Sequence, residues 1–82
     1  MWTMLALARE AQGETLRMLR AQAEAQWARG NASGAVDRIV AARVWSVAHP
    51  AIDPIEAQVV LTRERDMRRF MAAQAAAEAT DR

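Results

Sequence analysis

Few residues in this sequence could carry catalysis or bind a metal ion. It contains a single histidine, His49, and neither cysteine nor lysine. Zinc sites made of Cys and His need several such ligands, and helical di-iron sites need paired Glu-x-x-His motifs. The absence of lysine excludes both a Schiff base and the lysine-dependent phosphate-binding loop. We therefore expect a protein that is not an enzyme and that holds no metal ion or cofactor.

Two weak catalytic arrangements remain among the polar residues. A Ser–His–Asp triad would have to use His49, which precedes a proline in a short connection, together with Ser33 or Ser46. Glu10 and Glu14 lie one helical turn apart, but arginines stand near them in the sequence. Because acid–base catalysis needs desolvated carboxylates, a turn histidine and two solvated glutamates are the better interpretation.

The densest group of charges is the run RERDMRR at residues 63–69. On a helix, Arg65, Arg68 and Arg69 would share one side and could contact phosphates. Alternatively the run is a solvated surface in which Glu64 pairs with Arg68 at i,i+4. The formal net charge of the chain is only +1, and no aromatic residue of the run could stack on a base. We favour the solvated surface, and a small nucleic-acid-binding regulator is the alternative function.

The length of 82 residues predicts one helical domain, 1–82, with a thin core. A domain of this size buries only about 60–65% of the surface that its unfolded chain exposes. Apolar residues make up 52% of the chain, but many of them are alanine, which buries little area. Association with a partner subunit would add to such a core.

The composition also bears on origin and location. All eleven cationic side chains are arginine, and alanine is abundant, which indicates a GC-rich bacterial or phage genome. The opening MWTMLALAREAQ has no basic segment before its short apolar run, so we expect no signal peptide. No stretch approaches the ~20 apolar residues of a membrane span. We expect a location in the cytoplasm or within a phage or bacterial particle, away from membranes.

Two segments rich in Gly, Pro and Asn interrupt the helical patterns, at residues 30–34 and 49–54. The sequence therefore predicts an all-α fold, a three-helix hairpin or bundle. Two long helices are expected at about 2–29 and 54–80, and one shorter helix at about 34–48.

Local signals mark the ends of these helices. Asp53 as N-cap, Pro54 at the first helical position and Glu56 in the first turn together form the strongest signal in the chain. Gly30 suits the position that closes the first helix, and Ser33 is expected to cap the second.

Apolar residues at helical spacing predict a buried face on each helix. In the first helix, which continues through Gly13, the expected members are Met4, Leu5, Ala8, Ala11, Leu16, Met18, Leu19 and Ala23. In the second they are Val36, Ile39, Val40, Val44 and Val47, with Trp45 on an opposite apolar face beside alanines. In the third they are Ile55, Val59, Val60, Met67, Phe70 and Met71.

Arg43 and Arg63 project from the middle of apolar faces. A buried guanidinium without a partner is very costly, so each needs a carboxylate, carbonyl groups or access to water. Asp66 is the expected partner of Arg63, and Asp37 or an acid of a second chain the expected partner of Arg43. Extension of both side chains along the thin core into water is the alternative.

The predicted helix lengths do not match. At 1.5 Å per residue the outer helices run ~40 Å and the middle one only ~22 Å. Unless the chain folds back at Gly13, apolar residues at both extremities lack a covering layer, and such surfaces are typical of interfaces. With Trp45, the predicted protein interface is Trp2, Met4, Leu5, Leu7, Trp45, Phe70 and Met71. We expect a non-enzymatic structural or adaptor subunit whose partner is itself or a larger protein assembly.

Overall fold

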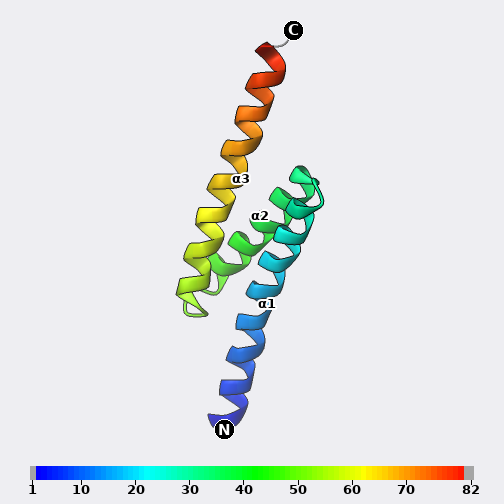
Figure 1. Cartoon of the computed structure of the whole chain (residues 1–82). Coiled ribbons are helices and arrows are strands. Elements are labelled where there is room, and N and C mark those ends of the chain that lie inside the picture. Colours follow the sequence, from blue (N-terminus) through cyan, green and yellow to red (C-terminus); the bar gives the residue numbers. More distant parts are fainter. Residues whose placement is uncertain (1, 81–82) are drawn as a thin grey trace.

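The protein folds into three α-helices, which are α1 (Trp2–Ala28), α2 (Ala32–Ala48) and α3 (Pro54–Thr80) (Figure 1). This computed structural model describes the backbone of residues 2–80 and the side chains of residues 10–80. The predicted all-α fold is confirmed, and each helix end lies within two residues of its predicted position. The helix α1 is continuous through Gly13, so the chain does not fold back there.

The connection between α1 and α2 is closed by Gly30. Its φ angle of 82° lies in the left-handed region, which glycine adopts without steric cost. The amide of Gly30 donates to the carbonyl oxygen of Trp27 (3.0 Å), and the amide of Asn31 donates to that of Gln26 (2.9 Å). These two bonds form a Schellman motif, which confirms the predicted role of Gly30.

The residue that caps α2 is Asn31 and not Ser33. The side-chain Oδ1 of Asn31 accepts from the amide of Gly34 at 3.1 Å, while Ser33 already lies inside the helix. The prediction for Ser33 was wrong because Asn31 satisfies two demands at once. Its amide completes the Schellman motif, and its side chain caps the next helix.

The connection between α2 and α3 ends at Asp53, as predicted. Its Oδ1 accepts from the amide of Glu56 (3.1 Å), and its carbonyl oxygen accepts from the amide of Ala57 (3.0 Å). Asp53 has a positive φ of 47°, a conformation that Asp and Asn tolerate better than most residues.

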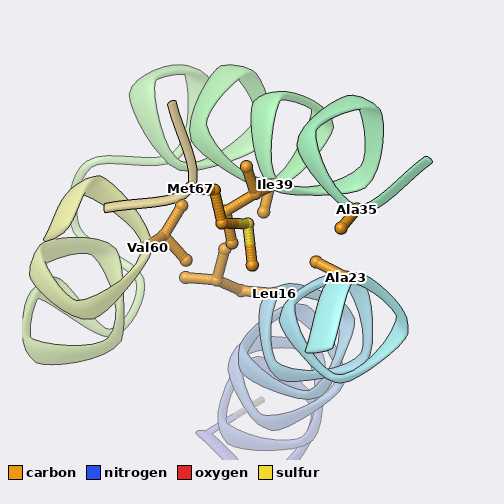
Figure 2. Packing of buried hydrophobic residues seen from close by; sticks show 7 residues of the cluster. Leu16, Ala23, Ala35, Ile39, Val60 and Met67 are labelled. Atoms are coloured by element: carbon orange, nitrogen blue, oxygen red, sulfur yellow. The ribbon is translucent and has the colours of Figure 1, made fainter. Parts of the chain in front are cut away.

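The core lies where all three helices meet (Figure 2). Its fully buried apolar members are Leu16, Ala23, Ala35, Ile39, Ala42, Val60 and Met67. Three of the seven are alanine, so the core is as thin as the composition indicates. Trp27, Trp45 and Leu19 pack against it and are half-buried.

The buried face of α2 differs from the predicted one. It consists of Ala35, Ile39, Ala42 and Ser46, whereas Val44 and Val47 are 57% and 70% exposed. The helix α2 packs against both α1 and α3. Small side chains allow a close approach to both neighbours, so the alanines face inward although valine is more hydrophobic.

Four other residues assigned to buried faces are also exposed, and they include Ala11 and Phe70. Met18 is exposed on α1, and Ile55 is exposed on the first turn of α3. The inner residues of the two long helices repeat instead at seven-residue intervals. They are Leu16 and Ala23 on α1, and Val60 and Met67 on α3. A face this narrow leaves the flanking apolar positions in water.

The short helix α2 runs antiparallel to both long helices, so α1 and α3 are parallel and displaced along their axes (Figure 1). The molecule measures 63 × 21 × 15 Å. The N-terminal part of α1 extends beyond one end of α2, and the C-terminal part of α3 extends beyond the other (Figure 1). We call these segments the α1 arm (residues 2–11) and the α3 arm (residues 72–80). The predicted mismatch of lengths is confirmed.

The two glycines inside helices should respond oppositely to alanine. Among the described side chains, a Cβ at Gly13 would meet only a guanidinium nitrogen of Arg17, at an ordinary 3.6 Å. We expect Gly13→Ala to stabilise the fold by about 1 kcal/mol, because alanine is the better helix former. A Cβ at Gly34 would stand 2.9 Å from Cγ of Asn31 and would displace the cap. Gly34→Ala should therefore bring no such gain. The melting temperatures of the two variants and the wild type test this difference, since 1 kcal/mol corresponds to about 4–8 °C in a domain of this size.

The Asp53 cap can be tested with a matched pair of variants. Asp53→Ala removes the acceptor for the amide of Glu56 and places alanine at a positive φ, so it should cost about 1 kcal/mol or more. Asp53→Asn keeps a side-chain oxygen and should cost much less. Urea unfolding followed by circular dichroism measures both. Equal stability of the alanine variant and the wild type would contradict the cap.

Candidate functional site

Among residues 10–80, the ion pairs that join different helices all end on α3. Arg20 of α1 pairs with Glu56, and Glu24 of α1 pairs with Arg63. The second pair is bidentate, with Nε of Arg63 at 2.5 Å and Nη2 at 3.0 Å from the two carboxylate oxygens of Glu24. Hydrogen bonding to Glu24 raises the pKa of Arg63 above its ordinary value. These contacts are half-buried, so water screens them only in part.

The third interhelical pair joins α2 to α3. Nε of Arg43 donates to Glu64 at 2.6 Å, and the other carboxylate oxygen of Glu64 accepts from Arg68 at 3.1 Å. The predicted Glu64–Arg68 pair is thus confirmed. Glu64 also accepts from Arg43 of α2. The charged run at residues 63–69 is therefore only partly a solvated surface.

Both arginines that project from apolar faces have carboxylate partners, as the cost of burial requires. The partners differ from the predicted ones. Arg63 binds Glu24 and not Asp66, and Arg43 binds Glu64 and not Asp37. Asp37 and Asp66 are exposed. Because both true partners lie on other helices, only the tertiary arrangement could identify them.

The three arginines suggested as phosphate contacts are all exposed on α3. Arg68 is held by Glu64, while Arg65 and Arg69 form no ion pair with another side chain of residues 10–80. Arg65 and Arg69 lie one helical turn apart on the surface of α3. Binding of nucleic acid through these arginines remains a prediction.

The predicted interface residues lie in different surroundings. Phe70 is half-exposed, and its ring meets that of Trp27 edge-on, with centroids 5.0 Å apart and planes at 72°. Met71 is half-buried. Trp45 packs against the core of its own chain and stacks on His49 at 4.1 Å, so part of its surface is used internally. Trp2, Met4, Leu5 and Leu7 belong to the α1 arm, and their side chains lie outside the described part.

A shallow hollow of about 310 Å³ lies where α3 passes the α1–α2 connection. Trp27, Gly30, Ala32, Phe70 and Gln74 line it. Aromatic side chains form its walls, and the α3 arm continues beyond it. Trp27 is absent from the predicted interface, because its contact with Phe70 depends on how far α3 is displaced along α1.

The weak catalytic arrangements are not assembled among the described residues. The Ser46 hydroxyl donates to the carbonyl oxygen of Arg43 (2.8 Å), and Nδ1 of His49 lies 2.9 Å from the carbonyl oxygen of Trp45. Both side chains thus contact backbone carbonyl oxygens near the C-terminal end of α2. Glu10 and Glu14 are exposed. In the part of the chain that the structure describes, no three His, Asp or Glu side chains lie together as metal ligands would.

Comparison with known proteins gives no family. No family model, curated protein or solved structure matches this chain. Within the described residues, no helix is long and apolar enough to cross a membrane.

The Glu24–Arg63 pair should contribute measurably to stability. Replacing either residue by Gln removes a bidentate contact between α1 and α3 and should cost about 1 kcal/mol, and a double-mutant cycle should give a coupling of similar size. Arg68→Gln is the matched control. Its contact with Glu64 lies within α3, so its loss should cost only a few tenths of a kcal/mol. Urea unfolding of the two single variants, the double variant and the Arg68→Gln control measures these free energies. A double variant whose loss of stability equals the sum of the two single losses would contradict the coupling.

Proposed function

We propose that this protein is a non-enzymatic structural or adaptor subunit that associates with itself or docks into a larger protein assembly. The observation that carries the proposal is the displacement of α1 and α3, which leaves an arm at each end with no intrachain layer over it (Figure 1). Most of the stability of a helix in a protein comes from packing against neighbouring elements, which the chain does not supply at these arms. A partner helix would supply the missing layer.

The distribution of apolar surface supports the same proposal. Besides Phe70, the exposed large apolar side chains include Met18, Val44, Val47 and Leu61. Each such side chain left in water forgoes up to about 1.5–3 kcal/mol of burial. The net stability of a small domain is only a few kcal/mol. Burial of several of these side chains in an interface would therefore be comparable to the net stability of the fold.

The composition fits a small component of a larger particle. A chain of 82 residues with eleven arginines, no lysine and abundant alanine is typical of a GC-rich bacterial or phage genome. The cytoplasm, or a phage or bacterial particle, is the proposed location.

The mass of the protein in solution tests the proposal. Sedimentation velocity over a hundredfold range of concentration should give a mass that rises with concentration. Leu5→Glu in the α1 arm and Phe70→Glu beside the α3 arm should shift the equilibrium toward the monomer by tenfold or more, since each places a charge in apolar contact surface. Arg38→Gln, at an exposed position of α2 away from both arms, is the control and should behave like the wild type.

A cooperatively melting monomer at every concentration, with no protein partner retained from the host, would contradict the proposal. Circular dichroism of each variant separates dissociation from unfolding. This check matters most for Phe70→Glu, because Phe70 contacts Trp27.

A further inference from the structure

Two surface strips with mirrored spacing lie on the long helices. The α1 strip is Glu10, Glu14 and Met18, and the α3 strip is Leu61, Arg65 and Arg69. Within each strip the residues are four apart, so they form one ridge of the helix surface. All six are exposed. None of the four charged groups forms an ion pair with another side chain of residues 10–80.

The strips are complementary only when the two helices are antiparallel. In that orientation Glu10 faces Arg69, and Glu14 faces Arg65. The same register places Met18 against Leu61, which are 52% and 45% exposed. One register therefore joins two pairs of opposite charge and one pair of large apolar side chains.

A single chain cannot make this contact. Its α1 and α3 are parallel, because both run antiparallel to α2 (Figure 1). Within the chain, α1 contacts α3 at Glu56, Arg63 and Phe70, which belong to another side of α3. The antiparallel register requires the α3 of another molecule.

We infer that the α1 strip and the α3 strip of two copies of this chain bind each other in antiparallel orientation. The inference rests on the proposed function and deepens it by naming the partner, the two surfaces and the register. Each chain carries both strips, so every copy offers an acidic ridge and a basic ridge to its neighbours. Charge complementarity of this kind directs orientation and partner choice more than it adds affinity.

Charge reversal tests the register. Glu10→Arg with Glu14→Arg makes both strips of one chain basic, and Arg65→Glu with Arg69→Glu makes both acidic. Each double variant should self-associate about tenfold more weakly than the wild type, because two attractive pairs become repulsive. An equimolar mixture of the two variants should recover association to within a few-fold of the wild type, because each acidic strip then meets a basic one. The chain with all four substitutions should recover it too.

A control of equal net charge completes the experiment. Arg29→Glu with Arg38→Glu changes the net charge as much as the α3 double variant does, at exposed sites outside both strips. It should associate like the wild type. Sedimentation equilibrium at fixed ionic strength measures all variants, and circular dichroism verifies their helix content.

The outcomes separate this inference from the proposed function. A wild-type chain that associates while the reversed variants associate equally well, or while their mixture fails to recover, overturns the antiparallel register and leaves the proposed function standing. A control that weakens as much as the reversed variants overturns the register as well. A wild-type monomer without any protein partner overturns both.

Discussion

The small inner face of α2 is the constraint on which the rest of the structure depends. Alanine and serine occupy three of its four buried positions. Helices that meet through small side chains approach closely, and close approach brings the edges of α1 and α3 within reach of long side chains. Arg20, Glu24 and Arg63 can therefore bridge two helices that share few direct contacts. A bulkier α2 would push the long helices apart and separate these pairs.

The ion pairs agree with the direction of the helices. Along α1 a cation, Arg20, precedes an anion, Glu24. Along the facing side of α3 an anion, Glu56, precedes a cation, Arg63. Parallel helices bring opposite charges together, whereas reversal of either helix would set like charges against each other. The connectivity imposes the parallel arrangement, and the charges support it. Such agreement between the connectivity of the helices and the order of their charges is typical of sequences that fold to one structure.

The helices and their ends could be predicted because the signals are local. Gly30 and Asp53 act through bonds to residues at most four positions away. The inner face of α2 could not be predicted, because hydrophobicity ranks valine above alanine, while the distance between the helices decides which residue fits. The partners of Arg43 and Arg63 were missed for a related reason. Sequence proximity favoured Asp37 and Asp66, but the nearest carboxylates in space come from other helices. Of the predicted interface, Phe70 and Met71 are only partly covered, while Trp45 is used largely within the chain.

The alanine content of the α3 arm has a physical consequence for association. Six of its nine residues are alanine, the residue with the highest helix propensity. Such a segment stays helical as a continuation of a helix that the core already nucleates, although its side chains contribute little burial. A preformed helix loses less conformational entropy on binding than a segment that must fold against its partner. Its small side chains also permit close contact between helices, as those of α2 do in the core. Alanine thus limits the apolar area buried in the core. At the end of α3 it maintains an ordered helix on which another helix can pack.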